Sequence, residues 1–230
     1  MDAARIAELL HPFLGPAGGQ QLTPNDLEQI STYVNILVRW NSRINLTAIR
    51  DPQEIVTRHF GESLFAASHL FPRGVATTVH GLPAASNHPG PTTSDRISAA
   101  DLGSGAGFPG VPLKLWAPGI QLTLIESNQR KSVFLREIVR SLILTDVNIQ
   151  SARAETLPPA SFDLVTLRAA ERFATVLPIA AALVKPSGRL ALLIGSAQVD
   201  RAQSLLPDRG WVPPLLVPGS HSRVLLSTRL

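Results

Sequence analysis

The chain has 230 residues, 44% of them hydrophobic, and it contains no cysteine. This length and apolar content support one full core, while the lack of cysteine excludes disulfides, a thiolate metal site and a cysteine nucleophile. The net charge of +4 comes from 18 arginines and 3 lysines set against 17 acidic residues, which suits a polyanionic partner and is equally consistent with a general preference for arginine. Neither a secretory signal nor a membrane-spanning apolar run is visible, so we expect a cytoplasmic protein, and nothing indicates more than a monomer.

Two helices are predicted near the start of the chain. The first covers residues 23–40, where Thr23 suits the N-cap, Pro24 suits the first helical position, and apolar residues recur at helical spacing. A second helix begins in the same way at Asp51-Pro52. We expect residues 1–72 to form a helical extension that packs on the domain that follows.

The segment between these helices combines arginines with an indole. Such a stretch can be a solvated connection, but arginine and tryptophan together can also hold RNA phosphate and stack on a base. Both interpretations remain open from composition alone. His59 falls on the apolar face of the second helix, and there we interpret it as a hydrogen-bonded core histidine rather than a base or a ligand.

Residues 73–95 are rich in Gly, Pro, Ser and Thr and lack periodicity, which predicts a flexible surface insertion. In residues 96–230 strand and helix patterns alternate, which predicts an α/β, Rossmann-like domain with a mainly parallel, doubly wound sheet. The predicted strands are 97–101, 121–125, 147–150, 163–167, 188–194 and 223–228, and the predicted helices are 109–117, 129–143, 171–184 and 198–206.

The most informative segment is Asp-Leu-Gly-Ser-Gly-Ala-Gly-Phe-Pro-Gly, residues 101–110. It stands between a predicted strand and a predicted helix, as in a glycine loop that holds a nucleotide cofactor. Gly103, Gly105 and Gly107 would let the backbone turn tightly and approach a ligand, and Gly110 would permit close packing. Taken alone, a loop of this kind can also serve only to turn the chain.

Polar residues at the ends of the following strands give the loop its context. Glu126 lies 23 residues beyond Gly103, where a carboxylate can bind both ribose hydroxyls of an adenosine cofactor. Ala154 and Glu155 follow the third strand and could contact the adenine, although Glu155 could instead cap a helix. Arg168 ends the fourth strand at the edge where ligands of open α/β sheets bind, so we favour a binding role over a surface ion pair.

A nicotinamide and S-adenosylmethionine both suit a glycine loop followed by an acid. Short-chain dehydrogenases need a tyrosine and a lysine four residues later, but the only tyrosine is Tyr33, and Leu37 follows it at that spacing. That route of hydride transfer is excluded, while other dehydrogenase designs remain possible.

The chain also lacks two features that common methyl-acceptor chemistries need. No Asn/Asp-Pro-Pro-Tyr loop is present for methylating an exocyclic amine, and no cysteine is present for attack on a pyrimidine. What remains is an acceptor that is already nucleophilic, such as a purine ring nitrogen, or an oxygen activated in another way.

Five parts of the chain carry a resemblance to a known family: residues 39–48, 51–60 with 63–64, 101–110, 153–155 and 168–169. Together they resemble the small-subunit ribosomal RNA guanine-N7 methyltransferases, once called glucose-inhibited division protein B. The similarity covers residues 22–195. The first two segments are specific to that family, whereas the glycine loop indicates only a class I methyltransferase. A non-catalytic RNA-binding or assembly module on the same fold is the alternative.

The resemblance implies methyl transfer from S-adenosylmethionine to N7 of a guanine in the helix 18 loop of 16S rRNA, with that rRNA or the small ribosomal subunit as partner and no metal ion. Three departures stand out: Ile194-Gly195 replaces a Lys-Gly of many relatives, the insertion at 73–95 is longer than usual, and the tail from Val212 matches poorly. The implied cofactor contacts are Gly103, Gly105, Phe108, Glu126, Ala154, Glu155 and Arg168. Candidate RNA contacts are Arg39, Arg43, Arg58, Arg130 and Lys131, and candidate positioning residues are Arg168, Asn45 and His59.

Overall fold

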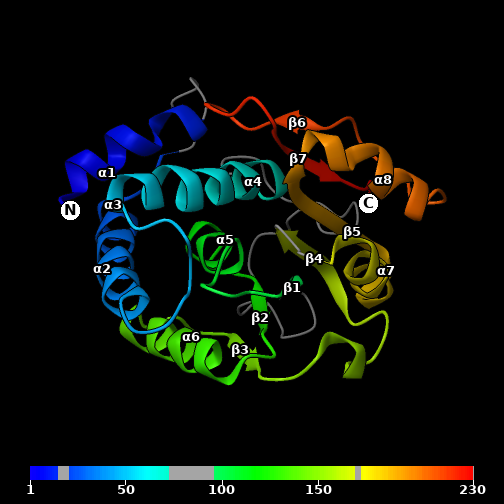
Figure 1. Cartoon of the computed structure of the whole chain (residues 1–230), viewed down its shortest axis with the longest axis horizontal. Helices are drawn as coiled ribbons and strands as arrows, with labels where there is room; N and C mark the ends of the chain where they lie inside the picture. Colours follow the sequence, from blue (N-terminus) through cyan, green and yellow to red (C-terminus); the bar gives the residue numbers. More distant parts are fainter. Residues whose placement is uncertain (15–20, 73–95, 169–171, 230) are drawn as a thin grey trace, which may run out of the picture.

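A seven-stranded sheet forms the centre of the protein, with strand order β3-β2-β1-β4-β5-β7-β6 (Figure 1). The computed structural model describes residues 1–14, 21–72, 96–168 and 172–229, so the predicted insertion at 73–95 lies outside the described residues. Strands β1 to β5 are parallel, whereas β7 runs antiparallel to β5, and β6 runs antiparallel to β7. The α/β fold class is thus confirmed. The strands are β1 (Ser98–Leu102), β2 (Gln121–Ile125), β3 (Val147–Gln150), β4 (Phe162–Arg168), β5 (Val184–Gly195), β6 (Leu215–Leu216) and β7 (Arg223–Ser227).

The helices before the sheet begin where their capping residues predict. Thr23 Oγ1 accepts a hydrogen bond from the Asp26 amide at 3.1 Å, and the Thr23 amide donates to the Asp26 carboxylate at 2.9 Å. Asp51 accepts in the same way from the amide of Glu54 at 2.8 Å. The second helix continues through a π-helical stretch, which was not predicted. The elements are α1 (Ala3–Leu10), η1 (His11–Phe13), α2 (Pro24–Asn41), α3 (Pro52–Glu54), the π-helix η2 (Ile55–Gly61) and α4 (Glu62–Leu70).

The later elements follow the predicted alternation with small differences in their bounds. The largest difference is at β5, which begins at Val184 rather than at residue 188. Val184 already pairs with Phe162, and the register between β4 and β5 then shifts between Phe162 and Leu164. The elements are α5 (Gly110–Trp116), α6 (Gln129–Ser141), η5 (Ala154–Thr156), α7 (Phe173–Leu183), η6 (Ser196–Gln198) and α8 (Val199–Leu205).

Two apolar clusters cover the two faces of the sheet. The first joins the sheet to α1, α2, η2, α4, α5 and α6, and the second joins it to α7 and α8. Side chains alternate between the faces along each strand. On β4, Leu164 enters the first cluster while Val165 and Leu167 enter the second, so Arg168 projects on the same face as Leu164. On β7 the same alternation directs Arg223 toward that face, where α4 lies.

Candidate active site

The loop between β1 and α5 turns tightly through residues with positive φ. The φ angles of Gly103, Gly105 and Gly107 are 70°, 57° and 87°, values that residues with a Cβ rarely adopt. The amides of Gly103 and Ser104 both donate to the carbonyl of Ile125 at the end of β2, at 2.9 and 3.1 Å. These hydrogen bonds hold the loop against the neighbouring strand.

The glycines of this loop serve different purposes. A Cβ added at Gly110 would lie 2.6 Å from Leu124 Cδ2 and 2.8 Å from the Asp101 side chain, which agrees with the predicted close packing. A Cβ added at Gly107 would collide with the hydroxyl of Tyr33. At Gly103, by contrast, a Cβ would meet nothing within 4 Å. The backbone at Gly103 therefore faces open space that a side chain would fill.

Glu126 is fixed beside the same loop. Its side chain is buried, and its two carboxylate oxygens accept from the amide of Gly105 at 2.9 Å and from the amide of Asn128 at 2.7 Å. Each carboxylate oxygen has a further lone pair for a hydroxyl donor. An oriented carboxylate next to the open backbone at Gly103 fits the ribose of an adenosine cofactor.

Ala154 and Glu155 lie in the short helix η5 after β3. Ala154 is buried and Glu155 is exposed. The N-cap position of η5 belongs to Arg153, which makes no capping hydrogen bond through its side chain. Glu155 therefore does not cap this helix, which removes the structural role that the sequence left open for it.

Phe108, a residue of the loop itself, forms an aromatic group with Tyr33 and His59. Its ring stacks on Tyr33 with centroids 5.3 Å apart and on His59 with centroids 4.8 Å apart. Tyr33 is fully buried and its hydroxyl donates to the carbonyl of Ala106. Burial raises the pKa of Tyr33 above its usual value, so this tyrosine supports the loop and is not available for proton or hydride chemistry.

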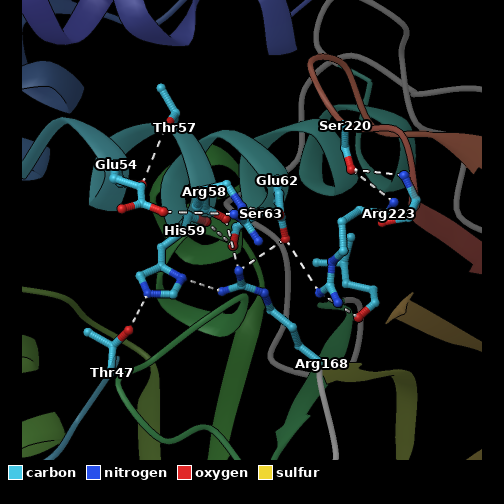
Figure 2. Close-up of polar contacts among 12 residues, drawn as sticks. Thr47, Glu54, Thr57, Arg58, His59, Glu62, Ser63, Arg168, Ser220 and Arg223 are labelled. Atoms are coloured by element: carbon cyan, nitrogen blue, oxygen red, sulfur yellow. Dashed lines mark hydrogen bonds and ion pairs between the residues drawn. The ribbon is translucent and has the colours of Figure 1, made fainter. Parts of the chain in front are cut away.

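The buried carboxylate of Glu62 forms ion pairs with three arginines at the carboxyl edge of the sheet (Figure 2). It contacts Arg168 Nη2 at 3.0 Å, Arg58 Nε at 3.2 Å and Arg223 Nη2 at 3.5 Å. The Nε atoms of Arg168 and Arg223 are buried and have no hydrogen-bond partner in the described part of the chain. This arginine cluster, formed by Glu62, Arg58, Arg168 and Arg223, carries more positive than negative charge.

His59 connects the arginine cluster to the segment that follows α2. Its Nδ1 lies 2.9 Å from Arg168 Nη1, and its Nε2 lies 2.7 Å from Thr47 Oγ1. Because a guanidinium can only donate, Nδ1 must accept, and the ring proton stays on Nε2 and points to Thr47. Burial, assisted by the charges of Arg168, Arg58 and Arg223, lowers the pKa of His59 to about 3. His59 is therefore neutral and hydrogen-bonded, in agreement with its interpretation from the sequence.

Asn41 shapes the segment that carries Thr47, a role the sequence did not reveal. Its Oδ1 accepts from the amides of Leu46 and Thr47 at 2.9 and 3.0 Å, and its Nδ2 donates to the Thr47 carbonyl at 2.9 Å. Asn45, the predicted positioning residue, is exposed. The buried asparagine of this segment thus supports His59 indirectly, while Asn45 faces solvent.

The candidate RNA contacts divide into two groups. Arg58 belongs to the arginine cluster. The other candidates lie on α2 (Arg39), just after it (Arg43) and on α6 (Arg130 and Lys131). Arg39 pairs with Glu137 of α6 at 3.2 Å, and Arg43 is exposed. Arg130 and Lys131 occupy the first turn of α6, capped by Asn128.

The sequence missed two members of the arginine cluster, Glu62 and Arg223. Glu62 stands four residues after Arg58, a spacing at which a helical ion pair forms, so a signal for it was present. Arg223 reaches Glu62 only through the pairing of β7 with β5 and lies in the tail that resembles the family poorly. Ile194 is fully buried in the second apolar cluster. The position where many relatives have lysine therefore faces away from Glu62.

Two further findings concern the kind of site. Among the described residues, no group of three or more His, Cys, Asp or Glu side chains could hold a metal ion. None of the helices in the described ranges is long and apolar enough to cross a membrane.

A mostly parallel sheet with an antiparallel β7, a glycine loop after β1 and an acid at the end of β2 defines a class I methyltransferase. A predicted O-methyltransferase from Agrobacterium tumefaciens has a similar fold, with a TM-score of 0.51 and 21% identity over 57% of this chain and 73% of that chain.

Sequence comparisons identify the family to which this chain belongs. The family model for rRNA small subunit methyltransferase G matches residues 26–77 and 88–206. The ribosomal RNA small subunit methyltransferase G of Xanthomonas campestris pv. campestris is 36% identical over 95% of this chain and 93% of its own length. The protein of the same name from Stenotrophomonas maltophilia is 38% identical over 81% of this chain and 78% of its own. This chain belongs to the rRNA small subunit methyltransferase G family.

Proposed function

We propose that this protein transfers the methyl group of S-adenosylmethionine to N7 of a guanine in the helix 18 loop of 16S rRNA. The observation that carries the proposal is the position of the arginine cluster, which shares the carboxyl edge of the sheet with the glycine loop and Glu126. A site for an adenosine cofactor thus lies beside a concentration of positive charge suited to RNA.

The cofactor is held in this proposal by Gly103, Gly105, Phe108, Glu126, Ala154, Glu155 and Arg168. Glu126 binds the ribose through the lone pairs that its two amide donors leave free, and the backbone of Gly103 lies against the ligand. When bound, S-adenosylmethionine supplies an electrophilic methyl group on its sulfonium. The protein has to exclude water and hold the acceptor in line with that group.

Guanine N7 carries a lone pair, so the reaction needs positioning more than a general base. The state of His59 agrees with this requirement, because both ring nitrogens are engaged and its pKa is lowered to about 3. His59 therefore acts as a positioning residue that orients Arg168. The buried Nε atoms of Arg168 and Arg223 offer unused donors for an anionic group.

RNA is held outside the cluster by Arg39, Arg43, Arg130 and Lys131, with Arg58 at the boundary, and Asn45 approaches the substrate from the segment after α2. The protein acts as a cytoplasmic monomer, which light scattering tests against the chain mass of 24.7 kDa. The alternative is a non-catalytic module, and the residue in its favour is Ile194, which replaces a lysine in the family pattern. That position is buried in the core, so its identity says nothing about decay of the site.

The proposal is tested with purified protein, methyl-labelled S-adenosylmethionine and three RNA forms: naked 16S rRNA, unmodified small subunits and assembly intermediates. Mass spectrometry should find 7-methylguanine in a single oligonucleotide from the helix 18 loop. Label at another base, or no label on any form, would overturn it. Titration calorimetry should show binding of S-adenosylmethionine and weaker binding of NAD.

A further inference from the structure

A shallow groove of about 560 Å³ lies between α6 and the edge strand β3, beyond the residues assigned to RNA above. Its rim includes Arg136, Arg140, Ile143 and Asn148, and none of its lining residues is acidic. Strand β3 is the outermost strand on this side of the sheet. The groove is therefore open to a partner and positively charged.

Ile143 is unusual both in exposure and in backbone conformation. Its side chain is 85% exposed, and its φ angle is 53°. A β-branched residue is strained at positive φ, where glycine or asparagine would be relaxed. Burial in the protein's own core offers almost no compensation. A strained and exposed apolar side chain beside a ligand groove points to a contact with something outside the fold.

The two arginines of the groove are largely free to bind. Arg136 donates to the hydroxyl of Ser151 at 2.8 Å, and the side chain of Arg140 makes no hydrogen bond or ion pair within the described residues. The only acid of α6, Glu137, pairs instead with Arg39 of α2. Arg140 also stands in the last turn of its helix, where a cation is favourable for the helix dipole alone. The experiment below separates that local role from binding.

Helix α6 connects the groove to the cofactor edge. It begins directly after Glu126 with Arg130 and Lys131 and reaches Arg140 in its last turn. With a rise of about 1.5 Å per residue, the helix spans on the order of 20 Å. A single strand of RNA that passes Arg130 can thus continue along the helix to the groove.

We propose that this groove binds an unpaired nucleotide of the rRNA substrate, several nucleotides along the strand from the methylated guanine. Arg136 and Arg140 contact its phosphates, and its base packs on Ile143. Charge complementarity selects RNA as the occupant, because the groove offers two guanidinium groups, which bind phosphate and can stack on unpaired bases, and none of its lining residues is acidic. The proposal rests on the proposed function and extends it to a second contact site.

The test measures the affinity of the full-length protein for unmodified small subunits and for a helix 18 RNA fragment, at several salt concentrations. Arg140→Glu should weaken binding to both about tenfold and lower the slope of log K against log salt by about 1. Arg201→Glu is the matched control, since Arg201 is also an exposed helical arginine and α8 lies across the molecule from α6 (Figure 1). Equal affinities of the two variants would overturn the proposal.

Ile143→Asn is the second variant. Asparagine tolerates the positive φ that strains isoleucine. The melting temperature should therefore stay the same or rise, while RNA affinity falls several-fold. A purely structural role for Ile143 predicts the reverse, and unchanged affinity would contradict the proposal. Weaker binding to intact subunits alone, with unchanged binding to the RNA fragment, would assign the groove to a ribosomal protein and also overturn it.

The groove and the proposed function fail in different ways. If the groove proposal alone is wrong, wild-type protein still methylates the subunits and Arg140→Glu binds them normally. If the proposed function is wrong, wild-type protein produces no 7-methylguanine on any RNA form. Calorimetry with S-adenosylmethionine should give the same affinity for all variants, because none of these residues lines the cofactor loop.

Discussion

The glycine loop and the arginine cluster lie at the same edge of the sheet, but they are built in different ways. The loop is made from backbone groups within about 25 residues, and its hydrogen bonds join Gly103, Ser104 and Gly105 to residues at the end of β2. The cluster is made from side chains of η2, α4, β4 and β7 that meet around Glu62. The loop therefore depends on the absence of side chains, and the cluster depends on a balance of charge.

The first way to test this comparison is to remove the charge of Glu62, which should give the largest effect. Glu62→Gln leaves Arg58, Arg168 and Arg223 without their shared carboxylate, and breaking a buried ion pair costs about 3–5 kcal/mol. Glu54→Gln is the matched control, because Glu54 pairs with the same Arg58 at 3.9 Å and both side chains are about half exposed. That surface pair contributes less than about 1 kcal/mol.

Urea unfolding of the wild-type protein and the two variants measures this difference. Glu62→Gln should lower the free energy of unfolding by several times the change caused by Glu54→Gln. Similar small changes in both variants would mean that the arginines do not depend on the buried carboxylate.

The second test adds a side chain to the loop. Gly103→Val places a branched side chain in the open space beside Glu126 and should lower the affinity for S-adenosylmethionine about 100-fold, or about 2.7 kcal/mol. Gly219→Val is the control, because Gly219 in the β6–β7 turn has the same φ of 70° and equally open surroundings. Both variants carry a similar backbone strain, on the order of 1–2 kcal/mol.

Calorimetry then separates strain from blocked binding. Gly103→Val should lose cofactor affinity while Gly219→Val keeps it, at a comparable loss of melting temperature. If both variants bind S-adenosylmethionine as the wild type does, the loop does not hold the cofactor.

The third test measures the pH dependence of stability that comes from His59, the histidine beside the arginine cluster. The folded-state pKa of His59 is about 3, below its ordinary value of 6.5, so the unfolded chain binds a proton that the native protein does not. The contribution of neutral His59 to the free energy of unfolding is thus fully present above about pH 6.5 and is lost as the pH falls toward 3. His59→Asn keeps an acceptor for Arg168 but has no titration, so it should lose stability less steeply on acidification.

The expected difference in slope is about 1 kcal/mol per pH unit between pH 6 and 4, somewhat below the limit for one proton because His59 is partly exposed. Asp101, whose pKa burial raises to about 6, acts in the opposite direction in this window but is present in both proteins. Parallel stability curves for wild type and His59→Asn would contradict a neutral His59.

The smallest effect is expected at the periphery of both regions. Arg39→Ala removes an exposed pair with Glu137 and should change the free energy of unfolding by less than about 1 kcal/mol. Because Arg39 is proposed to contact RNA phosphate, its loss should still weaken subunit binding a few-fold and reduce the salt dependence. Unchanged binding would restrict RNA recognition to the cluster and α6.

The sequence predicted one of these regions far better than the other, for a physical reason. The positive φ of the loop glycines and the position of Glu126 follow from a contiguous strand-turn-helix-strand pattern. The contacts of Arg168 with His59 and Glu62 join residues 109 and 106 positions apart. Such pairs depend on how helices and strands pack, and neither periodicity nor spacing encodes that packing.

The same limit applies to smaller elements. The bounds of α2 were predicted closely because Thr23 and Asp26 form a local capping box. By contrast, β6 has only two residues and was not predicted. Helix α1 lies within the expected helical extension of residues 1–72 but was not predicted as a separate helix. Arg58 and His59 lie on a π-helical stretch. The apolar repeat of this segment in the sequence does not distinguish it from an ordinary helix.

The most direct test of the central claim is mass-spectrometric mapping of 16S rRNA from cells that lack the gene, complemented with either wild-type protein or Gly103→Val. The account predicts that 7-methylguanine in the helix 18 loop disappears in the deletion, returns with the wild type and stays absent with Gly103→Val. An unchanged 7-methylguanine in the deletion strain would contradict it.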